Sequence, residues 1–590
     1  MVILGISAYY HDSAASLLID GKILAAAQEE RFSRVKHDSS FPNKACRFCL
    51  DYANITIRDV DQIVFYEKPF LKFERIIESH IEFAPRSFFS FIKVMPIWLK
   101  ERLNLRSLIQ CQIKKEFGEN MVPIKFVEHH WAHAAFAYYS SPYDSAAILV
   151  VDAVGEWATT SLMYGKGTQI EVIKEQHFPH SIGLLYSSFT YFLGFKVNSD
   201  EYKVMGLAPY GKVESEETKE YIKVIMNQLV NIKNDGSIII NTKHFSYHYG
   251  FKMINPLDWK ALFHINQRKE GEAITQSHCN LAYAIQYVTE LIALRLVKTL
   301  KIECGSSDNL CISGGTALNC AMNGKIIEDQ LFKNCFVPYS PGDGGGAIGA
   351  CLATYYLNST KRIENKMPYL GPAFLDCDIE KVLIEQNIAY QFFEDDLSLT
   401  KKVAASIAEG KIIGWFQGRM EFGPRALGNR SILADCRNEK MKQRVNSTIK
   451  FREEFRPFAP AILVEDIDKY FKFKQDSPYM MFTCKVQDLL CTNNEQRMDF
   501  AKAVNMCLST IPAVTHIDKT ARIQTVSKED NAMFHLLLSS YKEQTGCSVL
   551  LNTSFNVMGE PIVCSPQDAI HTFYESGIDC LVINHFIINK

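Results

Sequence analysis

The chain of 590 residues lacks any run of 18 apolar residues, and its first segment, MVILGISAYYHD, lacks both a basic region and a long apolar stretch. The first absence excludes a membrane-spanning helix, and the second argues against a signal peptide. Lysine and arginine (64) do not outnumber aspartate and glutamate (66), so the net charge is −2. A general positive field for nucleic acid is therefore missing. We expect a cytoplasmic protein that binds neither membranes nor nucleic acid.

The sequence also lacks low-complexity tracts and cysteine pairs at the spacing of a zinc site. Cys46 and Cys49 form a C-x-x-C pair, but no second pair follows at a suitable distance. The 17 cysteines are an odd number and lie mostly in apolar contexts, which is typical of reduced, buried thiols. With 47% hydrophobic and 22% charged residues, the chain has the composition of a soluble globular protein. Its length predicts two or more domains.

A repeated strand pattern is present instead. Residues 2–8, VILGISA, are predicted to form a strand, and a polar loop with His11 and Asp12 follows it. After the loop come a second strand, ASLLID, an Asp-Gly turn and a third strand, KILAAAQEE. The same plan starts again at residue 146 with AAILVVDAVGEW, whose loop carries Asp152 and Gly155. Two such units indicate a duplicated half-domain.

Helical patterns and a proline- and glycine-rich stretch complete the outline. We predict helices over residues 42–53, in 70–118 with PIWLKERLNLRSLIQCQIKKEF as the clearest case, and over 274–300. The segment NKMPYLGPAF places the main boundary between residues 355 and 372. The predicted fold class is α/β, with domains at 1–360 and 370–590.

One candidate metal site emerges from the first domain. The segment EHHWAHAAFAYY should be helical, so His129 and His133 share one helix face while His130 points elsewhere. Asp152 and Asp343 follow apolar strands, where ligands bind in α/β domains. Two imidazoles and two carboxylates suit iron, manganese or zinc better than calcium. The alternative is that each aspartate only caps a turn.

Two glycine turns and a charged segment are candidates for nucleotide contact. The motif SGGTALN, Ser313 to Asn319, lacks the Walker lysine and is not a P-loop, but its glycines free backbone N–H groups for an anion. GDGGGA also leads into a helix. In NSDEYKVMGLAPYGK, Glu201 and Lys203 are either a solvated charge pair or a ribose or phosphate contact.

The second domain contains a basic cluster. The segment from Arg419 to Arg456 contains ten lysines or arginines and five aspartates or glutamates. Arginines inside FGPRALGNRS and FRPFAP lie among glycine, proline and aromatic residues, as in rigid phosphate or carboxylate sites. Near the C-terminus, LLNTSFNVMGEPI offers the neutral polar groups of Asn552, Thr553, Ser554 and Asn556. A nucleic-acid groove is the alternative, although few aromatic residues accompany this short cluster.

Ten motifs in order resemble the O-carbamoyltransferases of the NodU/CmcH type, found in nodulation-factor, antibiotic and toxin biosynthesis. They are YYHDSAASLL, EERFSRVKH, HHWAHAA, DAVGEWATT, GLLYSSFTYFLGFKVNSDEYKVMGLAPYG, SGGTALNC, GRMEFGPRALGNRSILAD, KFREEFRPFAP, HIDKTARIQTV and LLNTSFNVMGEPIV. The resemblance covers nearly the whole chain. The departures are Ala153 and Asp200, which stand where the family usually has glycine.

The resemblance implies a fold and an activity. It implies an N-terminal domain of the actin, sugar-kinase and ribonuclease-H-like type and a C-terminal domain related to threonylcarbamoyl-AMP synthase. The second domain would form carbamoyl-adenylate from carbamoyl phosphate and ATP with Mg²⁺, and the first would pass the carbamoyl group to the hydroxyl of a small-molecule acceptor. The implied metal is iron, Fe²⁺ before Mn²⁺ or Zn²⁺. Whether the protein is a homodimer stays open.

The family motifs also imply residue roles. His11 is the expected catalytic base, and His129, His133, Asp152 and Asp343 are the expected metal ligands. The expected carbamoyl phosphate and ATP contacts are Arg425, Lys450, Arg456, Arg522 and Ser554, and the expected adenylate contacts are Lys203, Gly314, Gly315 and Asn319.

Three other functions are considered. A tRNA threonylcarbamoyl-adenosine enzyme would need a basic, aromatic surface for RNA, which the neutral composition disfavours. A noncatalytic actin-like or chaperone-like ATP-binding module would leave the histidine pair and the arginine cluster without a role. A sugar kinase would need no pocket for carbamoyl phosphate.

Overall fold

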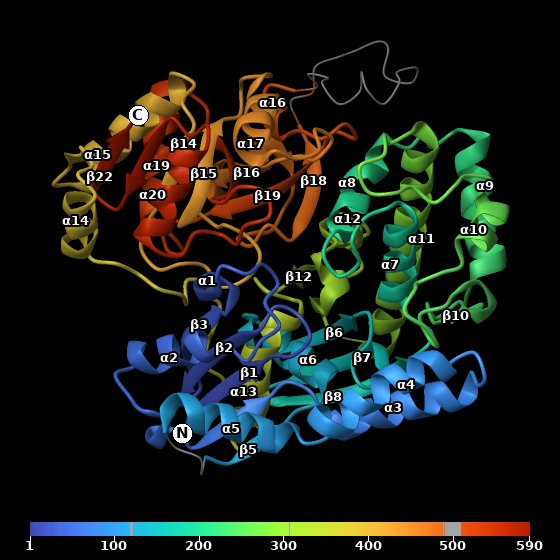
Figure 1. The fold of residues 1–590 in the computed structure, drawn as a ribbon. Coiled ribbons are helices and arrows are strands. Elements are labelled where there is room, and N and C mark those ends of the chain that lie inside the picture. The colour runs from blue at the N-terminus through green and yellow to red at the C-terminus, as the bar shows by residue number, and fades with distance from the viewer. Residues whose placement is uncertain (119–121, 306, 488, 490–508) are drawn as a thin grey trace. The chain divides into compact units, whose positions relative to one another are not determined.

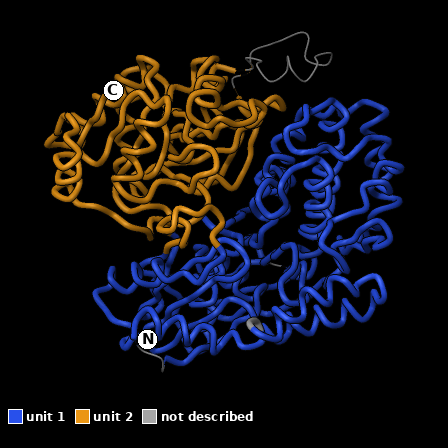
Figure 2. The backbone as a smooth tube through the Cα atoms, viewed as in Figure 1, with its two compact units in different colours: residues 1–26, 39–366 blue, residues 27–38, 367–590 orange. Residues whose placement is uncertain are grey.

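The structure is a computed structural model and describes residues 1–118, 122–305, 307–487, 489 and 509–590. Its backbone divides into two compact units, coloured separately in Figure 2. Unit 1 contains residues 1–26 and 39–366, and unit 2 contains residues 27–38 and 367–590. Both combine sheets with helices, which confirms the predicted α/β class (Figure 1). In the described ranges every cysteine is a free thiol, and no helix is long and apolar enough to cross a membrane.

The first sheet of unit 1 has five strands in the order β3-β2-β1-β4-β5. β1 pairs antiparallel with β2 and parallel with β4, and β4 pairs parallel with β5. The run of buried apolar residues in β1 fits a strand that is covered on both faces. The strands are β1 (Val2–Ser7), β2 (Ala14–Ile19), β3 (Lys22–Gln28), β4 (Gln62–Phe65) and β5 (Ile124–Phe126).

The second sheet of unit 1 repeats this plan. Its order is β12-β11-β6-β7-β8, and β6 pairs antiparallel with β7 and parallel with β11, while β11 pairs parallel with β12. Corresponding strands thus have the same order and sense, as the predicted duplication requires. The strands are β6 (Ser145–Val151), β7 (Ala158–Lys166), β8 (Gln169–His177), β11 (Asn309–Ser313) and β12 (Asn334–Phe336).

Two helices, α6 (His129–Ser140) and α13 (Gly346–Tyr356), pack against each other and each against one sheet (Figure 1). α13 lies on β1 and β2, and α6 lies on β6 and β11. The helices approach closely because a Cβ atom at Gly349 of α13 would lie 1.9 Å from the carbonyl oxygen of Ala132 in α6. Only glycine fits this contact.

The other helices of unit 1 include those predicted in residues 70–118, which the structure confirms. They are interrupted within 96–117: α4 ends at Ile97, a π-helical turn covers Trp98–Arg102, and α5 starts at Leu105. The interruption lets Leu105, Ile109 and Ile113 face the core. The elements are α2 (Asn43–Tyr52), α3 (Pro69–Glu82), α4 (Phe88–Ile97), α5 (Leu105–Phe117), α7 (Ile182–Phe192), α8 (Glu201–Leu207), α9 (Glu216–Val224), β9 (Val230–Ile232), β10 (Ile238–Ile240), α10 (Pro256–Phe263), α11 (Gln276–Glu303) and α12 (Cys320–Glu328).

Unit 2 is built on a ten-stranded sheet with the order β13-β22-β21-β14-β15-β20-β16-β19-β18-β17. Its strands are β13 (Gln391–Phe392), β14 (Ile413–Phe416), β15 (Arg430–Asp435), β16 (Ala459–Leu463), β17 (Phe471–Lys472), β18 (Phe482–Val486), β19 (Thr520–Val526), β20 (Val549–Ser554), β21 (Cys580–Ile583) and β22 (Phe586–Asn589). The helices are α14 (Asp376–Glu385), α15 (Asp396–Ala408), α16 (Met441–Val445), α17 (Ile467–Tyr470), α19 (Ala532–Thr545) and α20 (Pro566–Glu575).

Residues 27–38, which include the short helix α1 (Glu30–Ser33), belong to unit 2, whereas the sequence predicts one boundary between 355 and 372. Two arginines of this segment donate hydrogen bonds to unit 2 carbonyl groups. Arg31 donates to Gly423, and Arg34 donates to Pro561 and Ile562. The motif EERFSRVKH thus ties an early part of the chain to the C-terminal unit.

The contact at Gly349 generates a stability prediction. Gly349→Ala should destabilise unit 1 by about 3 kcal/mol, because the added methyl group must push α6 and α13 apart. Urea unfolding of the full chain measures the change. Gly250→Ala is the matched control, since its nearest neighbour would lie 3.3 Å away. Equal stability of both variants would show that the helix contact tolerates a methyl group.

Candidate functional site

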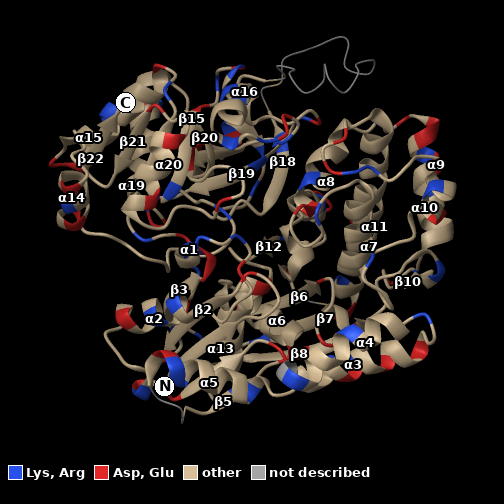
Figure 3. Cartoon of the chain, in the orientation of Figure 1, with Lys and Arg blue, Asp and Glu red and all other residues tan. Residues whose placement is uncertain are grey.

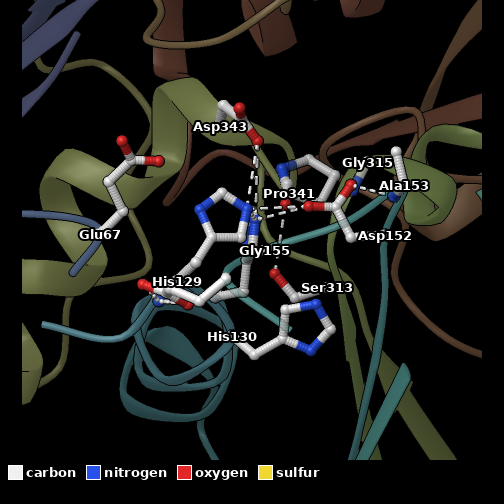
Figure 4. Close-up of polar contacts among 12 residues, drawn as sticks. Glu67, His129, His130, Asp152, Ala153, Gly155, Ser313, Gly315, Pro341 and Asp343 are labelled. Atoms are coloured by element: carbon white, nitrogen blue, oxygen red, sulfur yellow. Dashed lines mark hydrogen bonds and ion pairs between the residues drawn. The ribbon is translucent and has the colours of Figure 1, made fainter. Parts of the chain in front are cut away.

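Four predicted ligands converge in unit 1 from three places in the fold. His129 and His133 lie in the first two turns of α6, one above the other on the same face. Asp152 follows the last residue of β6, and Asp343 begins the short 3₁₀ helix Asp343–Gly345 that leads into α13. All four side chains are buried. The strand-end positions bring the two carboxylates to the imidazoles, and Figure 4 shows Asp152 and Asp343 beside His129.

The donor atoms of these four residues form one compact group. His129 Nε2 lies 2.8 Å from Asp152 Oδ2 and 3.1 Å from His133 Nε2. Asp343 Oδ1 lies 3.6 Å from His129 Nε2 and 3.8 Å from His133 Nε2. One ligand atom from each residue lies within 4.8 Å of the others.

The donor chemistry fits a transition-metal ion. Two imidazole nitrogens that face each other at 3.1 Å cannot both act as acceptors without a proton or a cation between them. Burial raises the pKa of Asp152, but hydrogen bonds and charges from His129 and His133 hold it well below its usual range. The ionised carboxylates and borderline nitrogens together suit iron, manganese or zinc.

The loop between β1 and β2 brings His11 to this group. Its Nε2 atom lies 3.6 Å from Asp343 Oδ2, and its Nδ1 atom lies 3.0 Å from Asp12 Oδ2. Tyr9 (φ 74°) and Asp12 (φ 53°) hold the left-handed backbone conformation on either side of it, which is unusual outside glycine. Burial lowers the pKa of His11, but Asp343 and Asp12 raise it more, to about 9.

His130 is separate from the ligand group, as predicted. Its Nδ1 atom lies 2.7 Å from the hydroxyl oxygen of Ser161 on β7. Burial lowers its pKa to about 3, so its ring is neutral.

The predicted adenylate contacts have protein partners of their own. The Gly315 N–H group donates to Asp152 Oδ1 at 3.2 Å, and the Gly314 N–H group donates to the Pro341 carbonyl at 3.0 Å. Asn319 caps α12 through the Met322 N–H group and pairs with Gln286. Lys203 lies 3.2 Å from Asp200. The glycine turn therefore supports a metal ligand, while Asn319 and Lys203 lie in other local networks.

In unit 2, Lys450 is the centre of a second buried polar group. Its ammonium group donates to the Ser554 carbonyl and hydroxyl and to the Asn556 carbonyl and side-chain oxygens, the last two at 2.9 Å. Burial lowers its pKa well below the usual range, and the positive charges of Arg452, Arg456 and Lys36 lower it further. Two other predicted residues thus interact with Lys450: Ser554 accepts its hydrogen bond, and the charge of Arg456 lowers its pKa.

The remaining two predicted arginines lie on other segments of unit 2. Arg425 is half-buried in the loop between β14 and β15, and Arg522 is half-buried on β19 opposite Thr483 of β18. Arg456 lies 3.5 Å from Glu453.

Family models match both parts of this chain. The model described as "Carbamoyltransferase N-terminus" matches residues 2–352, and "Carbamoyltransferase C-terminus" matches residues 404–590. The chain belongs to the carbamoyltransferase family. This confirms the resemblance that the ten motifs indicate.

Three curated proteins show what this family member is similar to. It is 46% identical to the uncharacterized protein sll1178 of Synechocystis sp., covering 100% of this chain and 96% of that protein. It is 34% identical to nodulation protein NolNO of Sinorhizobium fredii, and the match covers 99% of this chain and 79% of that protein. A 3'-hydroxymethylcephem-O-carbamoyltransferase of Amycolatopsis lactamdurans is 30% identical over 52% of this chain and 54% of that protein.

A solved structure, component A of (R)-2-hydroxyglutaryl-CoA dehydratase from Acidaminococcus fermentans, has 15% identity and a TM-score of 0.32. It covers 60% of this chain and 98% of that chain. A likeness this weak supports no argument about this carbamoyltransferase family member.

Sequence reasoning missed the residues that support the unit 1 ligands in this carbamoyltransferase family member. The Glu156 carboxylate accepts hydrogen bonds from the backbone N–H groups of His129, at 3.1 Å, and Lys68, at 2.7 Å. The buried guanidinium of Arg75 donates to the Gly155 carbonyl at 3.1 Å. The sequence did show an acidic residue, Glu156, four positions after Asp152. It did not show that Glu156 binds the backbone N–H groups of His129 and Lys68.

A second missed pair organises the loop between β14 and β15 in this family member. One carboxylate oxygen of buried Glu421 accepts from the N–H groups of Leu427, Asn429 and Arg430. The fully buried Arg430 side chain donates to the carbonyl groups of Gln417, Asn429, Pro372 and Gly418. Two opposite charges thus hold the segment that presents Arg425.

Glu421→Gln tests this loop organisation. The neutral amide accepts more weakly than a carboxylate, so we expect the amides of Leu427 and Asn429 to exchange with deuterium about tenfold to a hundredfold faster. Hydrogen–deuterium exchange followed by mass spectrometry measures the change. Glu439→Gln, an exposed neighbour, is the control. Unchanged exchange in Glu421→Gln would show that the charge does not organise the loop.

Proposed function

We propose that this member of the carbamoyltransferase family is an O-carbamoyltransferase that uses carbamoyl phosphate and ATP. The observation that carries the proposal is the buried group of His129, His133, Asp152 and Asp343, with His11 Nε2 3.6 Å from Asp343. A relative named as a 3'-hydroxymethylcephem-O-carbamoyltransferase supports a hydroxyl acceptor. The acceptor class is therefore a small-molecule alcohol, while its identity is left to experiment.

Unit 2 is proposed to activate the carbamoyl group. Hydrolysis of carbamoyl phosphate releases phosphate and carbamate, and the carbamate oxygen then displaces pyrophosphate from the α-phosphorus of ATP, carried with Mg²⁺. The product is carbamoyl-adenylate. The positive charges of Arg425, Arg456 and Arg522 are suited to the phosphate groups. Lys450 and Ser554 are proposed to orient the small carbamoyl substrate.

Unit 1 is proposed to transfer the group. The acceptor hydroxyl attacks the carbonyl carbon of carbamoyl-adenylate, the carbon–oxygen bond to AMP breaks, and the hydroxyl proton passes to His11 Nε2. An alcohol ionises far above neutral pH, so a base within hydrogen-bond reach lowers the barrier. Asp12 accepts from His11 Nδ1 and holds the ring orientation that leaves Nε2 free to take the proton.

A bound transition-metal ion, Fe²⁺ before Mn²⁺ or Zn²⁺, would offset the negative charge of the departing phosphate. It would also offset the negative charge of Asp343, which together with Asp12 raises the pKa of His11 in the ion-free arrangement. Asp152, Asp343, His129 and His133 are the proposed ligands. Gly314, Gly315, Asn319 and Lys203 remain the proposed adenylate contacts.

The finer fold assignment is part of the proposal. We assign unit 1 to the actin-like and sugar-kinase-like folds, which the repeated five-stranded sheet supports. We assign unit 2 to the threonylcarbamoyl-AMP synthase type. A tRNA-modifying function is less well supported, because the charge of the whole chain is −2.

Enzyme assays test the two proposed half-reactions separately. The wild-type protein should release pyrophosphate from ATP only when carbamoyl phosphate is present, and AMP release should rise with a suitable acceptor. His11→Ala should keep pyrophosphate release and slow acceptor carbamoylation about 100-fold to 10,000-fold, because only the base is lost. Arg425→Ala should abolish both.

The acceptor panel contains sugars, an aminoglycoside, a hydroxymethylcephem, a macrolactam and a guanidinium alkaloid, with tRNA as the competing substrate. Absence of pyrophosphate release that depends on carbamoyl phosphate, with Fe²⁺ and Mg²⁺ present, contradicts the proposed function. Carbamoyl transfer at the wild-type rate by His11→Ala contradicts the role of His11 alone.

Metal analysis tests the proposed ligands independently of activity. The purified wild-type protein should bind about one iron, manganese or zinc ion per chain, and His133→Ala should lose it after dialysis, because two histidines and two aspartates complete the shell. Elemental analysis gives the stoichiometry. His130→Asn is the matched control on the same helix and should keep the ion. Loss from the control alone, or from neither variant, would refute the assignment.

A further inference from the structure

One surface of unit 1, formed by α3 and α4, exposes large apolar side chains while small polar residues are buried beneath it. Ser87, just before α4, and Ser90 within it are buried, as is Met95, and the Ser90 hydroxyl donates to the carbonyl groups of Ser87 and Tyr249. The same helix exposes large apolar side chains to solvent, with Phe89 79% exposed. A surface helix of a monomer normally has the opposite arrangement.

The exposed apolar side chains form what we call the α3–α4 face. Its members are large aliphatic and aromatic residues, each more than a third exposed: Phe70, Ile81, Phe88, Phe89, Phe91, Ile92, Ile97 and Leu99. At roughly 100 Å² each, scaled from the 150–250 Å² of an aromatic side chain, they present about 800 Å² of apolar surface. Isolated apolar patches on monomers rarely exceed a few hundred Å². This summed apolar area is of the same order as the total surface, polar and apolar, that one partner buries in a standard protein–protein interface, about 800 Å².

Charge on the two helices points to the partner. The exposed acidic residues of α3 are Glu74, Glu78 and Glu82, whereas the exposed basic residues on and beside α4 are Arg86, Lys93 and Lys100. Figure 3 shows acidic residues along α3 and basic residues along α4. One helix is therefore an acidic stripe and its neighbour a basic stripe, with apolar side chains on both.

A surface of this kind is complementary to a copy of itself. In a twofold pair, each residue of one copy that contacts a residue of the other is contacted in return, so α3 of each copy can face α4 of its partner. The acidic stripe then meets the basic stripe twice, and the apolar side chains fill the centre. An anionic lipid surface would attract the basic stripe but repel the acidic one.

We propose that the α3–α4 face binds a second copy of this chain and forms a homodimer. The proposal is independent of the enzyme activity. Figure 1 shows α3 and α4 as neighbouring helices of unit 1, so no rearrangement of their backbone is needed to present both stripes together.

Sedimentation equilibrium of the full chain at micromolar concentration tests the proposal. The wild-type protein should be a dimer, and Phe89→Glu should raise the dissociation constant of the dimer by roughly thirtyfold or more, as expected for an apolar residue at an interface centre. Ile384→Glu, a 63% exposed apolar residue on α14 of unit 2, is the control and should leave the dimer unchanged. Circular dichroism checks that both variants are folded.

Charge reversal tests the pairing of the stripes. A variant with Glu74→Lys and Glu78→Lys has two basic stripes, and a variant with Lys93→Glu and Lys100→Glu has two acidic stripes. Each variant alone should be monomeric because like charges oppose each other. An equimolar mixture should form a heterodimer, because both α3–α4 contacts then join opposite charges.

The following results overturn the proposal. They are a monomeric wild-type chain, a dimer that Phe89→Glu does not weaken, or a mixture of the two charge-reversed variants that stays monomeric. Flotation of a monomeric wild-type chain with vesicles of phosphatidylcholine and phosphatidylserine would assign the face to a membrane surface instead.

Discussion

The close contact of α6 with α13 determines where the predicted ligands of unit 1 lie. His129 and His133 belong to the first turns of α6, and Asp343 lies just before α13, so the separation of the helices sets the distance between nitrogen and carboxylate donors. Gly349 allows that separation to be small. A bulkier residue there would move the histidines away from Asp343 without touching any ligand. Packing and chemistry therefore depend on the same helix contact.

Three buried charges, one in unit 1 and two in unit 2, are each held by several backbone groups. Glu156 accepts from two N–H groups beside the unit 1 ligands, and Glu421 accepts from three N–H groups in unit 2. Arg430 donates to four carbonyl groups. Such bonds offset the cost of removing a charge from water. They also fix the loops that present Asp152 and Arg425.

Local patterns were enough to predict which residues gather in the buried group of unit 1. The spacing of His129 and His133 follows from helical periodicity, and the position of Asp152 follows from the end of an apolar strand. The convergence of these residues depends on strand order, which the repeated pattern indicated. The partners of Glu156 and Glu421, and the membership of residues 27–38 in unit 2, depend on contacts between distant parts of the chain. No local propensity records such contacts, so they were not predicted.

The repeat in unit 1 has a consequence for the symmetry of its ligand group. α6 follows the last strand of the first sheet, and α13 follows the last strand of the second, so the two helices are equivalent elements of a pseudo-twofold pair. The first half supplies only nitrogen donors, from His129 and His133, and the second supplies only oxygen donors, from Asp152 and Asp343. Neither half contains all four of the predicted ligands. Rotation of one half about the pseudo-axis would change every nitrogen-to-oxygen distance, whereas the distances within each donor pair would stay constant.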